Sequence, residues 1–240
     1  MRSPDPQRPP RPTGTSGPFR LSGRATAALF AVLGLALVVA TDQVLPATSD
    51  RQAELRFWLA ARATGLVAFG LLTVQVLIGL LLSHPTNKST WKLSKRVFPW
   101  HDHLWVFVTA FLIVHVLSLV ADPKSHVGLI GAVIPGLSEY RSVPVALGTL
   151  GLYALLVTAV SARYTKLLPP GVWLRLHRLS IVVFAMAWAH GVLAGTDTPT
   201  LRLAYIATGV FVALAAAYRY WVVRAARAAQ SRSAMEVART

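Results

Sequence analysis

The 240-residue sequence contains no cysteine. This absence excludes disulfide bonds, thiolate nucleophiles, iron–sulfur clusters and the covalent C-x-x-C-H attachment of c-type haem. Charged residues are scarce as well, at 14% of the chain, whereas a soluble domain carries about a quarter. No G-x-G-x-x-G or P-loop pattern occurs, and about 18 residues follow the last apolar run, too few for a flavin- or nicotinamide-binding domain.

Apolar residues dominate the sequence, at 54% of the chain with a mean hydropathy of +0.53. Six apolar runs approach the length of about 20 residues that spans a hydrocarbon core of ~30 Å. They cover residues 25–43, 57–82, 103–121, 144–162, 173–194 and 201–222. We predict an all-α membrane protein: a six-helix bundle over 25–222, preceded by a disordered basic tail over 1–24 and followed by a basic tail over 223–240.

The basic residues that give the net charge of +15 are concentrated in alternate predicted loops. Of the 24 arginines and lysines, 17 lie before the first run, between the second and third, between the fourth and fifth, or around and beyond the end of the sixth. The other three connections hold five. This asymmetry predicts that both termini are cytoplasmic, in a plasma or bacterial inner membrane. Membrane topology therefore accounts for the basic charge, and we expect no nucleic-acid partner.

Four of the seven histidines lie within or at the ends of two apolar runs. His101 lies near the start of the third run and His115 toward its other end, and His177 and His190 lie in the same way in the fifth run. Both runs are predicted to cross from inside to outside, which places His101 level with His177 and His115 level with His190. The two levels are about 20 Å apart by helical rise. Each pair is predicted to supply the two axial ligands of a haem iron, so we expect two non-covalent b-type haems.

The helical angles suit one run better than the other. Fourteen residues at about 100° each bring His115 onto the face of His101. Thirteen residues leave His190 about 140° away from the face of His177 in an ideal helix. Helix tilt, local overwinding or a bulge are the alternatives that would absorb part of this angle.

These histidine segments resemble a known family. "HDHLWVFVTAFLIVH" (101–115) and "LHRLSIVVFAMAWAHG" (176–191) are similar to the ferric reductase-like transmembrane domain that NADPH oxidases, ferric reductases and related bacterial proteins share. The stretches "RATGLVAFGLLTVQVLIGLLLS" and "DPKSHVGLIGAVIPGLSEYRSVPVALG" resemble its stand-alone bacterial members. The resemblance, over about 57–200, implies that His101 and His177 bind an inner haem and that His115 and His190 bind an outer one. In oxidases and ferric reductases, FAD and NADPH domains follow these helices. This sequence departs from that pattern.

Other residues in the runs are candidates for contact with the haems. Arg62, inside the second run, is expected either to pair with a propionate of the outer haem or to extend to the membrane surface. Arg178 is a candidate for the propionates of the inner haem. Gly65, Gly70 and Gly79 are expected to permit close approach of a haem or a helix.

The remaining histidines are weaker candidates. His103 is an alternative ligand in the third run, but it lies two residues from His101 and points elsewhere. His84 is expected to be solvated in an internal loop. His126 is either solvated or near the outer haem edge, for which Tyr140 and Arg141 in the same external loop are further candidates.

The expected function is that of a membrane cytochrome b, an oxidoreductase component that carries electrons outward. The donor is expected to be a separate cytoplasmic flavoprotein or a membrane quinol, and the acceptor to lie outside. One alternative is the haem subunit of a two-protein reductase, like the membrane partner of periplasmic methionine sulfoxide reductase. Another is a haem-free transporter or assembly protein.

Overall fold

The computed structural model describes residues 48–83, 91–169 and 171–238, with isolated positions 25, 28, 29, 32 and 36. This part of the chain is helical and contains no strand. Its elements in order are α2 (Asp50–Leu82), α3 (Trp91–Ala121), α4 (Gly128–Val133), α5 (Ser142–Arg163), a 3-10 turn η1 (Thr165–Leu167), α6 (Val172–His177), α7 (Ser180–Ala194) and α8 (Thr198–Val237).

Five helical segments of the described chain are long and apolar enough to cross a membrane, with α6 and α7 together forming one of them. The prediction of an all-helical, multi-pass protein is confirmed to that extent. The tail 1–24 lies outside the described residues, as does most of the predicted run 25–43.

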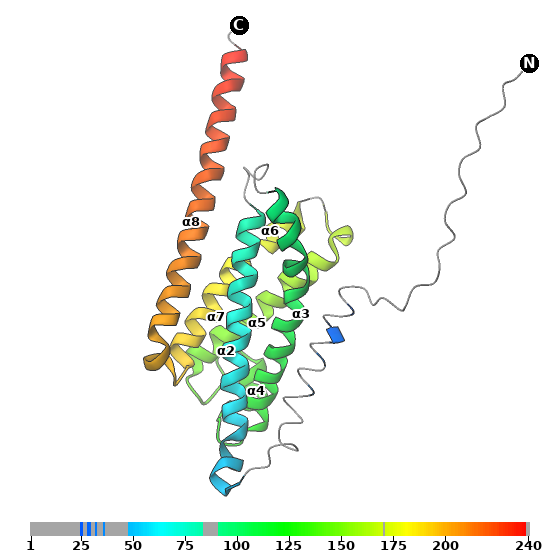
Figure 1. The fold of residues 1–240 in the computed structure, drawn as a ribbon. Coiled ribbons are helices and arrows are strands. Elements are labelled where there is room, and N and C mark those ends of the chain that lie inside the picture. Colours follow the sequence, from blue (N-terminus) through cyan, green and yellow to red (C-terminus); the bar gives the residue numbers. More distant parts are fainter. Residues whose placement is uncertain are drawn as a thin grey trace, which may run out of the picture.

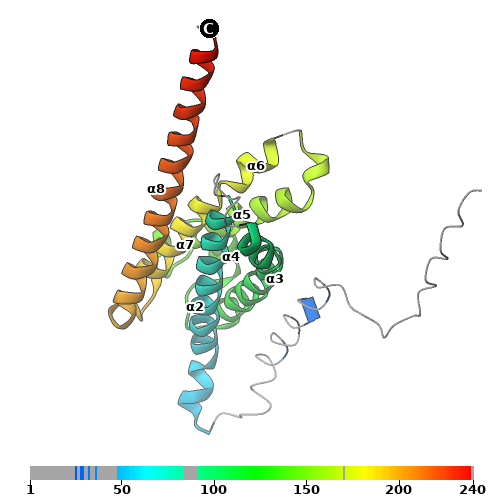
Figure 2. The same ribbon diagram turned by 45° about the horizontal axis from the view of Figure 1, so that its top comes forward.

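The helices form one elongated bundle (Figures 1 and 2). The α2 helix packs along α3, and α5 packs along α7 and α6. The α2 helix also contacts α7 and α8. The α8 helix continues through the basic segment 223–237 and extends beyond the other helices at its C-terminal end (Figure 1).

A buried apolar cluster joins four of these helices. It comprises Leu72 and Val76 of α2, Val108 of α3, Val183 and Phe184 of α7, and Val212 of α8. Val108 is seven residues from both His101 and His115 in the sequence, so the cluster lies midway between the two predicted histidine levels. Apolar side chains of four helices therefore lie between the two levels.

The α3 helix begins earlier than the sequence predicted. The predicted run covers 103–121, but α3 starts at Trp91 and holds Pro99 in its interior. The preceding segment "WKLSKRVF" contains neither glycine nor proline and continues the helix. The proline removes one backbone hydrogen bond of the helix and leaves the turns on either side in place.

The fifth predicted run is interrupted just after its first histidine. The α6 helix ends at His177 and α7 begins at Ser180. The amide of Leu179 donates to the carbonyl of Leu176 at 2.9 Å, the i to i+3 bond of a 3-10 turn. Each residue in such a turn rotates the chain by about 20° more than an α-helical residue does. Overwinding, one of the alternatives considered above, is therefore present between His177 and His190.

Candidate functional site

The structure brings His101 and His177, which were predicted to form the inner pair, together between α3 and the end of α6. Their ring centres are 6.0 Å apart and the rings are inclined by 86°. Nδ1 of His101 lies 3.2 Å from the backbone carbonyl oxygen of Gln75 in α2. The Gln75 amide donates in return to the His101 carbonyl at 2.9 Å. This reciprocal contact fixes the depth of His101 against α2.

His177 is held differently from the other three histidines. Its Nδ1 is buried and has no hydrogen-bond partner among the described residues. The ring of Trp173, one turn earlier in α6, has its centre 6.1 Å from that of His177. The position of His177 is therefore set by its neighbours and by the turn that follows it, without a backbone carbonyl to orient the ring.

The outer pair, His115 of α3 and His190 of α7, is arranged in the same way. Their ring centres are 6.3 Å apart and the rings are inclined by 80°. Nδ1 of His115 lies 2.7 Å from the carbonyl oxygen of Ala61 in α2. Nδ1 of His190 lies 2.8 Å from the carbonyl oxygen of Pro144 in α5. Each ring of this pair is thus anchored by a helix other than its own.

The carbonyl contacts determine which ring nitrogen is available. A carbonyl oxygen only accepts, so Nδ1 of His101, His115 and His190 must carry the proton that it donates. Nε2 then keeps its lone pair in the neutral ring. Metal-bound histidines have this arrangement, with one nitrogen on the metal and the other donating to a carbonyl or carboxylate.

Three glycines provide the space in which the histidine rings lie. A Cβ added to Gly65 of α2 would lie 2.8 Å from Nδ1 of His115, and one added to Gly79 would lie 3.1 Å from Cε1 of His101. A Cβ on Gly148 of α5 would lie 2.8 Å from Nδ1 of His190. The close approaches expected at Gly65 and Gly79 are present, and a Cβ at Gly70 would meet nothing within 4 Å.

Gly148 was missed as a site residue by the sequence reasoning. The sequence feature that could have identified it is its position near the start of the fourth run, at the predicted level of His190. Three of the four rings are therefore packed against a backbone that carries no side chain.

The ring separations fit two imidazoles that share one metal ion. An ion held about 2.0–2.1 Å from each nitrogen separates the two nitrogens by about 4 Å and the ring centres by about 6 Å. The observed separations are 6.0 and 6.3 Å. The described residues contain no group of three or more His, Asp or Glu side chains placed to hold a metal ion. Haem needs only two protein ligands, because its macrocycle supplies the other four.

An apolar cavity of about 210 Å³ adjoins the outer pair. Both histidines line it, together with polar or aromatic side chains at its outer end, which are Trp58, Arg62, Tyr140, Asp197 and Tyr205. Arg62 and Asp197 form an ion pair, in which Nε of Arg62 donates to Oδ2 of Asp197 at 2.6 Å. Arg62 thus lies at the outer site, and in the structure its partner is a carboxylate of this chain.

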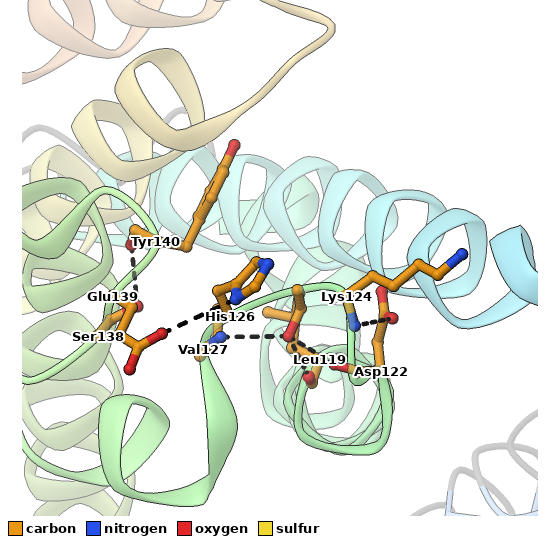
Figure 3. A network of polar contacts seen from close by, with 9 residues as sticks. Leu119, Asp122, Lys124, His126, Val127, Ser138, Glu139 and Tyr140 are labelled. Atoms are coloured by element: carbon orange, nitrogen blue, oxygen red, sulfur yellow. Dashed lines mark hydrogen bonds and ion pairs between the residues drawn. The ribbon is translucent and has the colours of Figure 1, made fainter.

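The loop 122–141 lies over the outer end of this cavity and is braced by its own polar groups (Figure 3). The buried Ser125 hydroxyl donates to the carbonyl of Asp122 at 2.9 Å, and the Tyr140 hydroxyl donates to the carbonyl of Ala194 at 3.0 Å. His126 extends toward Glu139, 3.8 Å away, and is 67% exposed, so it belongs to the outer surface of the loop.

The remaining predicted residues do not join either histidine pair. Arg178 is exposed beyond the end of α6 and makes no polar side-chain contact with the described residues. Nδ1 of His103 lies 2.5 Å from the Pro99 carbonyl, one turn earlier in its own helix. His84 lies outside the described residues.

Comparisons with known proteins do not extend this description. No protein-family model, no curated protein and no solved structure matches the chain. The inferences below therefore depend on the residues and their geometry.

The ion pair between Arg62 and Asp197 is expected to contribute to stability. Its side chains are about a third exposed, at 35% and 28%, which moderates the electrostatic gain. In a double-mutant cycle of Arg62→Gln and Asp197→Asn, we expect a coupling of about 0.5–1.5 kcal/mol in the free energy of unfolding, measured by denaturant titration in detergent. The control is the more exposed pair Lys124 and Glu54, for which we expect less than about 0.5 kcal/mol. Equal couplings for the two pairs would contradict this interpretation.

Proposed function

We propose that the chain is a membrane cytochrome b that carries electrons across the bilayer through two haems, each bound by two histidines. The observation that supports this most strongly is the pairing of four histidines at two depths, with ring centres 6.0 and 6.3 Å apart. When bound, each haem supplies an iron that alternates between ferric and ferrous states and so holds one electron at a time.

The residues of the chain contribute ligation and orientation. His101 and His177 are the ligands of the inner site, and His115 and His190 those of the outer site. Donation from Nδ1 to a backbone carbonyl, as at His115 and His190, increases the electron density at Nε2 and favours its bond to iron. The same carbonyl contacts would hold the orientation of the rings toward a bound haem.

The proposed direction of transfer follows from the distribution of charge. The four basic segments, with 17 arginines and lysines against five in the other connections, favour a topology with both termini in the cytoplasm. His101 and His177 then lie nearer the cytoplasm. An inside-negative potential favours outward movement of an electron by about 2.3 kcal/mol per 100 mV. The donor we propose is a separate cytoplasmic flavoprotein or a membrane quinol, and the acceptor lies outside.

We expect two non-covalent b-type haems per chain. The experiment is a pyridine haemochrome assay on the purified protein after expression with haem supply, normalised to protein by amino-acid analysis. The expected ratio is about two, because each haem takes two of the four paired histidines. Acidified organic solvent should extract all of the haem, since the sequence contains no cysteine to bind it covalently.

A ratio near one would restrict the proposal to a single-haem protein. A colourless protein would refute the proposal and would favour a haem-free transporter or assembly protein. The electronic spectrum adds an independent check, because two-histidine ligation gives a low-spin iron that does not bind carbon monoxide readily.

A further inference from the structure

A second hollow lies between α7 and α8, at the end of the bundle where α7 ends and α8 begins. Its volume is about 630 Å³. Its walls include Trp188 and Val192 of α7 and Pro199 and Ile206 of α8, and it is also lined by two arginines. Ile206 is 48% exposed on the outside of the bundle, so this groove opens toward the surrounding lipid.

The two arginines, Arg141 and Arg202, have no carboxylate partner among the residues that the structure describes. Arg141 donates through one Nη to the carbonyl of Leu193 at 2.6 Å, and its guanidinium carbon lies 5.6 Å from the centre of the Tyr140 ring. Arg202 is exposed and makes no polar side-chain contact with the described residues. The carboxylate nearest to Arg202 along the chain, Asp197, has both oxygens on Arg62. The carboxylate nearest to Arg141, that of Glu139, lies 3.8 Å from Nδ1 of His126 and does not line the groove. The groove therefore has an excess of positive charge.

The apolar part of the groove extends inward from the arginines. Trp188 and Ile206 are about two helical turns from the ends of their helices, which places them roughly 10 Å deeper than the connection 195–197. The Trp188 indole donates to the carbonyl of Tyr205 at 2.8 Å, so it offers the groove only its ring. The lining thus changes from cationic at the end of the bundle to apolar within the membrane.

We propose that this groove binds an anionic phospholipid. The guanidinium groups of Arg141 and Arg202 hold the phosphate and the anionic head group. The segments of the acyl chains nearest to the head group lie against Trp188 and Ile206. Guanidinium groups pair with phosphate through parallel hydrogen bonds, and basic pockets between transmembrane helices select lipids by their head groups. A soluble phosphate would satisfy the arginines but would leave the apolar walls uncovered.

The position of the groove connects this lipid to the outer histidine pair. Gly195, Thr196 and Tyr205 line both the groove and the cavity beside His115 and His190. These three residues form a shared wall between the two spaces. A lipid in the groove covers the side of this wall that faces away from the cavity. It therefore closes the cavity of His115 and His190 on the side of the groove.

The test uses the full chain in nanodiscs of phosphatidylcholine that contain a photoactivatable phosphatidylglycerol or, in parallel, a photoactivatable phosphatidylcholine at the same mole fraction. After illumination, labelled peptides are identified by mass spectrometry. We expect phosphatidylglycerol to label peptides from 188–206 more strongly than phosphatidylcholine does. Arg141→Gln and Arg202→Gln should each lower this labelling by about fivefold, since each removes one cation near the phosphate.

Arg51→Gln is the matched control, because Arg51 is an exposed arginine at the start of α2 that does not line the groove. It should leave the labelling unchanged, and excess soluble glycerol phosphate should not displace the lipid. Equal labelling by the two lipids, no effect of the groove variants, or full displacement by glycerol phosphate would overturn the proposal. Haem content is measured on the same samples, so that a haem-free protein with intact labelling would refute the proposed function alone.

Discussion

His177→Ala is expected to remove the inner haem, to leave the outer one and to reduce outward electron transfer by orders of magnitude. His177 ends α6 and faces His101 at 6.0 Å, whereas His115 and His190 lie about 20 Å away by helical rise, beyond a packed apolar cluster. Without His177, the inner site would keep only one of the two residues that would hold a haem there. A cytoplasmic donor then faces a gap that spans both levels.

The measurement combines a haem-to-protein ratio with electron transfer across proteoliposomes. The ratio should fall from about two to about one. External dithionite should still reduce the remaining haem and give the spectrum of two-histidine ligation. The reverse pattern is expected for His190→Ala, in which a donor on the cytoplasmic side reduces the inner haem and no electrons leave.

His103→Ala is the control within the same helix. Its Nδ1 contacts the carbonyl of Pro99, and His103 lies two residues from His101 on a different face. This variant should keep both haems and normal transfer. If His103→Ala removes the inner haem and His101→Ala does not, the ligand in α3 has been assigned two residues from its true position. If all of the variants keep both haems, the histidines are packing residues and the proposed function fails.

The pairing of the histidines was predictable from the sequence because it depends on quantities that single helices determine. Helical rise fixes the depth of each histidine, and loop charge fixes the direction of each helix. These two properties predicted that His101 is level with His177 and His115 with His190, on two helices that run in the same direction. The ring separations of 6.0 and 6.3 Å agree with that prediction.

Contacts that depend on how the helices pack were not predictable in the same way. The 3-10 turn at Leu179 has no glycine or proline to mark it, so the sequence left three alternatives for reducing the angle between His177 and His190 around the helix. Arg62 was expected either to pair with a haem propionate or to extend to the membrane surface, and the structure shows it paired with Asp197, which is 135 positions away in the sequence. Such a long-range pair becomes visible only when α2 and α8 are placed side by side.

Gly148→Ala is expected to lower the affinity of the outer site for haem by about 10- to 100-fold, the usual effect of disturbing a group that orients a metal ligand. A Cβ at this position of α5 would lie 2.8 Å from Nδ1 and 2.9 Å from Cε1 of His190. The ring cannot move away freely, because its Nδ1 is bonded to the Pro144 carbonyl of the same helix at 2.8 Å. Either that bond or the position of Nε2 must change.

Gly151→Ala, one turn later in α5, provides the matched control. A Cβ there would lie 3.5 Å from Cβ of Met186, an ordinary contact distance. Replacing glycine by alanine inside a helix stabilises it by roughly 0.5–1 kcal/mol, so neither variant should weaken α5 itself. Haem titration of the two variants, read from the spectrum and from the haem-to-protein ratio, should therefore show loss at the outer site for Gly148→Ala alone. Equal haem affinities in the two variants would mean that the close packing of His190 against α5 does not determine its ligation.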